Sequence, residues 1–196
     1  MAKYSHSEIF TQIYKENVWG AGSGTGSVVE NCYPLIGWFQ VFLKRQRIET
    51  FIDYGCGDWQ WMQYVNLDGV TYRGIDCADS IVAQNIRCFG RDNISFSSGT
   101  IIESIAIADL AFCKDVLQHL PNREVIEIID AFLKNSKYVI AINGSMGQYL
   151  NEDIDVGGYR PIDISLPPFN YVIENLLEYS PRKGEVNKSI QLVRLP

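Results

Sequence analysis

The stretch FIDYGCGDWQWM, residues 51–62, decides the fold of this 196-residue chain. It opens on two apolar residues typical of a short strand and runs directly into a turn that contains Gly55 and Gly57. Paired glycines let the backbone turn tightly and approach a ligand at the carboxyl end of a strand. About 20 residues further on, a second strand-like run over 71–75 ends in Asp76, at the spacing of a carboxylate that accepts hydrogen bonds from a ribose. The pattern predicts a site for a nucleoside-containing cofactor.

The glycine turn lacks the form that binds a dinucleotide. A pyrophosphate-binding turn has the pattern G-x-G-x-x-G, but Gln60 stands at the third glycine position here. Asp58 occupies the place of the phosphate, which it would repel, and it suits the N-cap of a helix predicted over 58–66. S-adenosylmethionine carries a cationic sulfonium and no phosphate, so the carboxylates of Asp53 and Asp58 favour it over a dinucleotide.

Three segments of the chain, taken in order, resemble the motifs of the class I S-adenosylmethionine-dependent methyltransferases. They are IDYGCGDW, YRGIDCADSIV and ADLAFCKDVLQHLPN, and the resemblance covers roughly residues 50–142. It implies a Rossmann-like fold and S-adenosylmethionine as cofactor. By the same resemblance, Asp53, Gly55 and Gly57 line the methionine and ribose side of the cofactor, and Asp76 holds the ribose hydroxyls.

The adenine side departs from the family pattern. The resemblance places Cys77 beside the adenine, but the acidic residue that the family often has after its third strand is replaced by SSGT at 97–100. We expect Ser98 or a backbone group to contact the adenine amine instead.

Strands and helices alternate along the middle of the chain. The sequence predicts strands at 51–54, 71–75, 93–96, 109–114 and 137–142, and helices at 28–47, 58–66, 79–88 and 122–134, with a short helix or loop over 99–107. Two final strands, 170–179 and 188–194, joined by a turn at 180–184, predict an antiparallel hairpin at one sheet edge. We therefore predict an α/β Rossmann-like fold with a mostly parallel seven-stranded sheet and helices on both faces.

Composition indicates one domain over residues 1–196, because 46% apolar residues can form one substantial core. We divide it into an N-terminal lid or helical segment (1–47), a cofactor-binding core (48–142), a substrate loop (143–168) and the C-terminal hairpin (169–196). A net charge of −6 disfavours a nucleic-acid partner, since phosphate contacts need clustered Lys and Arg. The five cysteines show no C-x-x-C pairing, and the sequence has no secretory signal and no apolar run of membrane length. These features predict a cytoplasmic protein. No metal site is predicted.

Candidates for catalysis follow the fourth predicted strand. His119 has the unperturbed pKa best suited to a base at neutral pH, and its alternative is a structural turn residue. Asp115 is a second candidate, as base, metal ligand or turn former. Lys114 is expected to contact the methionine end of the cofactor, mainly through its backbone.

The segment WGAGSGTGS, residues 19–27, reads either as a flexible linker or as a lid over the cofactor. As a lid, it would bring Trp19 to the cofactor, and Ser23 and Ser27 would bind the methionine carboxylate at a helix start.

The 143–168 loop is expected to choose the acceptor. Its mixture of carboxylate, aromatic and cationic side chains suits a polyhydroxylated molecule such as a sugar. The residues are Asn143, Asp153, Tyr159 and Arg160. Together with a resemblance to glycan-modifying methyltransferases, this predicts O-methylation of a saccharide or related small acceptor. The alternatives are methylation of another small molecule or a protein, a non-catalytic nucleoside-binding module, and a Rossmann oxidoreductase.

Overall fold

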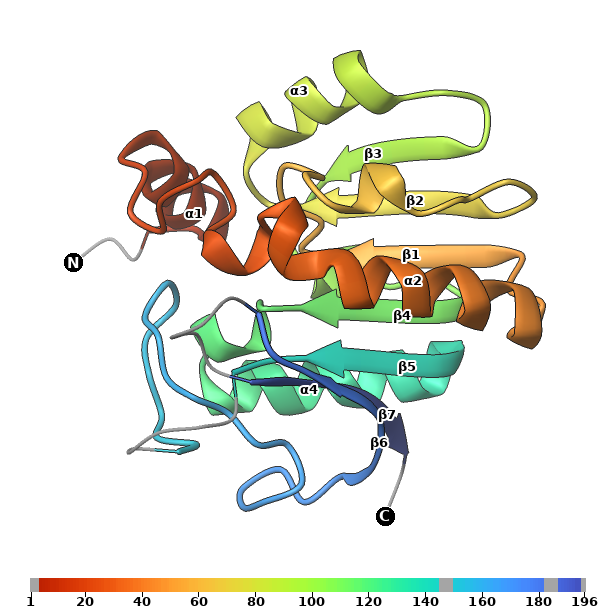
Figure 1. Ribbon diagram of the computed structural model, residues 1–196. Helices are drawn as coiled ribbons and strands as arrows, with labels where there is room; N and C mark the ends of the chain where they lie inside the picture. The colour runs from red at the N-terminus through yellow and green to blue at the C-terminus, as the bar shows by residue number, and fades with distance from the viewer. Residues whose placement is uncertain (1–3, 145–149, 182–186, 195–196) are drawn as a thin grey trace.

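The computed structural model describes residues 4–144, 150–181 and 187–194, which form one seven-stranded sheet in the order β3-β2-β1-β4-β5-β7-β6 (Figure 1). The strands are β1 (Thr50–Tyr54), β2 (Thr71–Asp76), β3 (Ile94–Ser98), β4 (Ala108–Lys114), β5 (Ser136–Ile142), β6 (Val172–Tyr179) and β7 (Lys188–Arg194). β1 to β5 pair in parallel, whereas β7 is antiparallel to both of its neighbours. The predicted fold is confirmed; residues 182–184 of the predicted hairpin turn lie outside the described part.

Helices lie on both faces of this sheet (Figure 1). The α-helices are α1 (His6–Lys15), α2 (Val29–Gln46), α3 (Asp79–Phe89) and α4 (Asn122–Asn135). The described part of the chain also contains four short 3-10 turns: η1 (Thr25–Ser27), η2 (Met62–Tyr64), η3 (Ile102–Ser104) and η4 (Leu117–His119). Within the described residues, no helix is both long enough and apolar enough to cross a bilayer.

The strands bury alternate residues on opposite faces because side chains alternate across a sheet. In β4, Leu110 and Phe112 pack in the cluster built on α2, whereas Ala111 and Cys113 pack in the cluster built on α4. Phe39 of α2 belongs to the first cluster and has no exposed surface. The centroids of the Phe39 and Phe112 rings lie 4.9 Å apart. Burying such a side chain contributes about 1.5–3 kcal/mol. This core fixes the strands that carry the site.

The predicted helix over 58–66 is wrong. Residues 58–61 form turns, and the one regular piece in this range is η2. Trp59 has a left-handed backbone (φ 60°), which a right-handed helix excludes. Trp59, Trp61 and Met62 are all buried in the α2 cluster, a spacing that one helix face does not provide. Asp58 is therefore not a helix N-cap.

α1 was not among the predicted elements. Its start carries a capping box, in which the Ser5 hydroxyl accepts from Glu8 N and the Glu8 carboxylate accepts from Ser5 N. This S-x-x-E pattern, followed by Ile9, Phe10 and Ile13, was the available sequence signal. α1 lies beyond the carboxyl ends of the parallel strands (Figure 1), and Phe10 is buried.

Candidate functional site

A cavity of about 550 Å³ opens at the carboxyl ends of β1, β2 and β4. Most of the residues predicted to bind the cofactor line it: Trp19, Ser23, Ser27, Asp53, Gly55, Gly57, Asp76, Cys77 and Lys114. Both catalytic candidates, Asp115 and His119, line it as well. The topology thus brings together residues from four separate sequence motifs, as expected where parallel strands end at one edge of a sheet.

The turn after β1 requires its two glycines. Gly55 (φ +77°) and Gly57 (φ +56°) both adopt left-handed backbone, which glycine enters without strain. A Cβ on Gly55 would lie 2.2 Å from Val116 Cγ2, and one on Gly57 would lie 2.4 Å from Ser23 Oγ. The turn is therefore packed tightly between the β4 loop and the 19–27 segment.

The backbone amides of this turn are already used within the protein. Gly55 N and Cys56 N donate to Ile75 O (2.8 and 3.0 Å), Gly57 N donates to Asp76 Oδ2 (3.0 Å), and Asp58 N donates to Ser23 Oγ (2.9 Å). A phosphate group needs such amides, usually at the start of a helix, and no helix starts here. The turn offers a pyrophosphate neither donors nor a helix dipole.

Two buried carboxylates face the cavity instead. Burial raises the pKa of Asp53 to about 7, against the hydrogen bond from the Tyr72 hydroxyl (2.7 Å) and with the help of the Asp76 charge. Burial also raises the pKa of Asp76, although Ala78 N (3.0 Å) and Gly57 N donate to its two oxygens. A carboxylate offers about four acceptor sites, so Asp76 retains capacity for a further donor beyond these two amides and that of Cys77. These carboxylates favour hydroxyl donors and cations, not anions.

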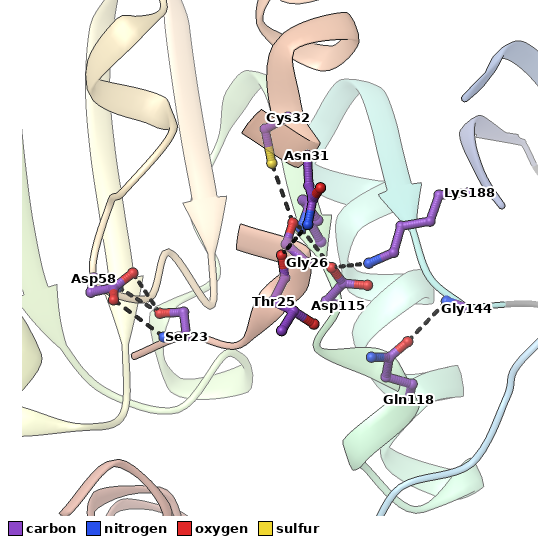
Figure 2. Close-up of polar contacts among 11 residues, drawn as sticks. Ser23, Thr25, Gly26, Asn31, Cys32, Asp58, Asp115, Gln118, Gly144 and Lys188 are labelled. Carbon is purple, nitrogen blue, oxygen red and sulfur yellow. Dashed lines mark hydrogen bonds and ion pairs between the residues drawn. The ribbon is translucent and has the colours of Figure 1, made fainter. Parts of the chain in front are cut away.

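Ser23 fixes the glycine-rich segment to the turn (Figure 2). Its hydroxyl donates to Asp58 Oδ1 (2.7 Å) and accepts from Asp58 N, so the Tyr14 hydroxyl (2.9 Å) must be the donor in its own bond. One proton and two lone pairs are thereby used, which leaves Ser23 Oγ no capacity for the predicted methionine carboxylate. The structure therefore uses Ser23 and Asp58 to hold residues 19–27 against the turn, so this segment is not a free linker, and the roles predicted for Ser23 and Asp58 at the cofactor are not supported.

Asp115 pairs with two lysines from different strands, of which Figure 2 labels Lys188. Lys114 Nζ donates to Asp115 Oδ2 and to Gly26 O (2.8 Å), and Lys188 Nζ of β7 pairs with the same Asp115 oxygen. Burial disfavours the Asp115 charge, but the two ammonium groups outweigh it and lower its pKa to about 2. A carboxylate held so firmly ionised is a weak base, so the catalytic prediction for Asp115 is not supported.

His119 lines the cavity with one ring nitrogen bound to the protein. Its Nδ1 lies 2.7 Å from Gly158 O, and a carbonyl oxygen can only accept, so Nδ1 carries the proton in the neutral ring. Burial lowers the pKa of His119, which keeps the ring neutral at pH 7. Nε2 then has its lone pair available on a ring that lines the cavity, next to Trp19 (ring centroids 5.0 Å apart).

The residues predicted to bind the acceptor lie outside the cavity wall. Arg160 is buried and donates to Leu117 O and Leu120 O, and Asp153 accepts from Asn122 N at the start of α4. Both charged side chains therefore bind backbone groups of the protein itself. This corrects the prediction that Arg160 and Asp153 bind the acceptor. Tyr159 is 59% exposed with its ring 5.7 Å from that of His119.

Two further predictions also fall outside the cavity wall. Asn143 is buried at the end of β5, and its side-chain nitrogen and oxygen have no hydrogen-bond partner within the described structure. Ser98 is exposed, whereas the neighbouring Gly99 and Thr100 line the cavity. The Ser98 side chain is therefore not placed to contact an adenine amine in the cavity, as was predicted.

Several cavity residues were not among the predicted site residues: Phe10, Tyr14, Arg123, Glu124 and Glu127. Phe10 and Tyr14 belong to α1, whose capping box was the signal. Arg123, Glu124 and Glu127 follow Pro121 on α4, where their facing depends on how the helix docks. Nothing in the sequence indicated that Lys188, which lies outside the cavity wall, pairs with Asp115, because the order of the strands in the sheet brings these two residues together.

No protein-family model matches the chain, and none of the curated proteins matches it. Solved structures are similar. Magnesium protoporphyrin IX methyltransferase from Synechocystis PCC 6803 with bound SAM has a TM-score of 0.69 at 14% identity, covering 99% of each chain. Human N-acetylserotonin methyltransferase in complex with SAM has a TM-score of 0.61 at 12% identity, covering 98% of this chain and 61% of that chain. Mitomycin 7-O-methyltransferase has a TM-score of 0.58 at 15% identity, covering 81% and 53%. The fold is that of the class I methyltransferases.

Proposed function

We propose that the protein is an S-adenosylmethionine-dependent methyltransferase that methylates a hydroxyl group, most specifically on a saccharide or a related small polyhydroxylated acceptor. The observation that carries the proposal is the turn after β1. Its amides are consumed internally while Asp53 and Asp76 face the cavity, so the site disfavours a phosphate-bearing cofactor and favours a cationic nucleoside.

The residues present fit the parts of S-adenosylmethionine. Asp76 would accept from the ribose hydroxyls with its remaining lone pairs, and Cys77 would lie at the adenine. Lys114 uses two of its three protons on Gly26 O and Asp115, which leaves one for the methionine carboxylate near Ser27. Two of the similar structures are described with bound SAM, which supports S-adenosylmethionine as the cofactor.

Bound S-adenosylmethionine would supply an activated methyl group, and the chain would supply position and a base. Its methyl group would pass from the sulfonium sulfur to the acceptor oxygen, with S-adenosylhomocysteine as the leaving group. His119 Nε2 takes the hydroxyl proton. The Trp19 ring beside His119 provides an apolar face on which a sugar ring can stack.

The first experiment is calorimetric titration of the protein with S-adenosylmethionine and, separately, with NAD. The proposal expects binding of the first and none of the second. A panel of sugars and glycans, together with other small hydroxylated compounds, is then incubated with methyl-labelled S-adenosylmethionine and analysed by mass spectrometry. NAD binding would support an oxidoreductase. Cofactor binding with no product from any acceptor would support a nucleoside-binding module.

Replacing Lys114 with methionine tests the methionine end. We expect about tenfold or more weaker binding of S-adenosylmethionine, because a hydrogen bond to a charged group contributes about 1.5–3 kcal/mol. Decarboxylated S-adenosylmethionine should bind both proteins equally, since it lacks the group that Lys114 contacts.

The matched control is Lys188→Met, which removes the same charge from an ammonium that pairs with the same carboxylate but is not in the cavity wall. It should weaken binding less than Lys114→Met. An equal loss for both cofactors in Lys114→Met would exclude a contact with the carboxylate.

Cofactor binding should also depend on pH through Asp53. Because the pKa of Asp53 is raised to about 7, the carboxyl is partly protonated below that pH, and a cationic ligand must displace the proton. Affinity should therefore rise as the pH increases toward 7 and level off above it. Calorimetry in buffers of different ionisation enthalpy would count the protons released.

Asp53→Asn supplies the comparison for this pH dependence. The amide cannot titrate, so the affinity of the variant should be lower and flat between mildly acidic and neutral pH. A slope equal to that of the unmodified protein would assign the proton to another group.

A further inference from the structure

The turn that carries His119 is too short to orient the ring by itself. η4 spans Leu117–His119, and a single 3-10 turn has few internal hydrogen bonds. Within this stretch, His119 N donates to Val116 O (2.8 Å) and Leu120 N donates to Leu117 O (3.2 Å). The carbonyl oxygens of Gln118 and His119 are not used in these two bonds. Because both residues are buried, a second segment of the chain must supply hydrogen-bond donors to them.

Residues 157–160 supply these partners. Gly157 N donates to His119 O (2.9 Å), and Arg160 N donates to Gln118 O (3.1 Å). Between these two contacts, Gly158 O accepts the Nδ1 proton of the His119 ring (2.7 Å). The same short segment therefore binds both the backbone and the ring of His119, and its position decides which ring nitrogen is protonated.

The Arg160 side chain holds this segment in register with η4. Nη1 donates to Leu117 O (2.9 Å), and Nη2 donates to Leu120 O (2.8 Å) and to Asn122 Oδ1 (2.8 Å). The guanidinium thereby spans the turn from the residue where η4 begins to the start of α4. Arg160 is 2% exposed, and a planar fork of donors matches several carbonyls at once where a lysine matches one.

We infer that Arg160 is a positioning residue, which keeps Gly158 O against the His119 ring and so holds His119 with its proton on Nδ1 and its lone pair on Nε2. The role in catalysis rests on the proposed function. The effect on the ring does not, because it follows from the contacts between 157–160 and η4.

The test reads the ring directly. Since the chain contains two histidines, a long-range ¹H–¹⁵N correlation spectrum of the labelled protein above pH 7 shows two imidazole rings, and His119→Ala assigns them. We expect the unmodified protein to show His119 with the proton on Nδ1. Arg160→Met, which keeps the length of the side chain and removes its donors, should show a mixture of both tautomers.

Two further variants separate positioning from general stability. Arg160→Lys restores one donor and should recover part of the Nδ1–H population. Arg194→Met removes an arginine from an exposed pair with Glu174 and should leave the spectrum unchanged. The positioning of His119 should not affect the affinity for S-adenosylmethionine. We therefore expect Arg160→Met, Arg160→Lys and Arg194→Met to bind it within about twofold of the unmodified protein, a difference below about 0.5 kcal/mol.

An unchanged His119 tautomer in Arg160→Met would overturn the inference. The inference would also be overturned if Arg160→Met and Arg160→Lys both lost S-adenosylmethionine affinity together with the Nδ1–H tautomer, because that would indicate collapse of the whole site. With an acceptor identified, Arg160→Met should lower kcat about tenfold with little change in the KM for S-adenosylmethionine. In the His119→Ala background it should have no further effect on kcat. If no acceptor is found, the proposed function fails while the spectrum still decides the inference.

Discussion

Replacement of His119 by alanine should lower turnover by about 10²-fold or more, the usual contribution of a positioned general base. The reason is the state of the ring, which is buried, neutral at pH 7 and protonated on Nδ1 by its bond to Gly158 O. S-adenosylmethionine affinity should be retained, since the ring is assigned to the acceptor and not to the cofactor. Initial rates of S-adenosylhomocysteine release and calorimetric titration measure the two quantities separately.

His119→Asn is the more discriminating variant. The asparagine amide can still donate to Gly158 O, which preserves the contact that anchors the 157–160 segment, but it has no basic nitrogen. If His119 acts as a base, both variants lose turnover alike. If it only holds the turn, asparagine should restore most of the activity that alanine loses, and the residue would be structural.

The pH profile gives an independent check of this base. The lowered pKa of His119 means that the ring loses its proton below the usual pH, so kcat should rise as the pH increases through that value and be level at neutral pH. In His119→Asn the rise should disappear. Persistence of the same rise would assign it to another group.

The elements that follow local rules were predictable from the sequence. The glycine turn and the acid that closes β2 are each short patterns whose geometry follows from backbone freedom and strand spacing. The parallel sheet followed from alternation of strands and helices. The residues expected on the cofactor side were assigned from this spacing together with the resemblance to methyltransferases, and most of them line one cavity.

What failed depends on contacts between distant segments. Asp58 was read as a helix cap because it follows a glycine turn, but it binds Ser23, which lies 35 positions earlier. Arg160 and Asp153 were assigned to a sugar from their chemistry, yet Arg160 holds the turn at η4 and Asp153 holds the start of α4. The sequence indicates what a charged side chain can bind, whereas the fold decides whether another part of the chain has already bound it.

Loss of the Asp76 carboxylate should produce the largest effect on cofactor binding. Asp76→Ala removes the oxygens assigned to the ribose, and lost hydrogen bonds to a charged group correspond to about 1–3 kcal/mol, or about 5- to 150-fold in affinity. The same substitution leaves Gly57 N and Ala78 N without their acceptors, so part of the loss comes from the turn itself. Calorimetry on S-adenosylmethionine measures the total, and thermal unfolding of the unliganded protein reports the damage to the turn.

A ligand without ribose hydroxyls separates these two contributions. Adenosine and 2′,3′-dideoxyadenosine differ in the groups that Asp76 is proposed to bind, so the unmodified protein should prefer adenosine and Asp76→Ala should prefer neither. If the preference survives in the variant, the hydroxyls are bound elsewhere. Should Asp76→Ala instead bind S-adenosylmethionine as tightly as the unmodified protein, the carboxylate would be excluded from the site. The cofactor assignment would then have to be rebuilt without its central contact.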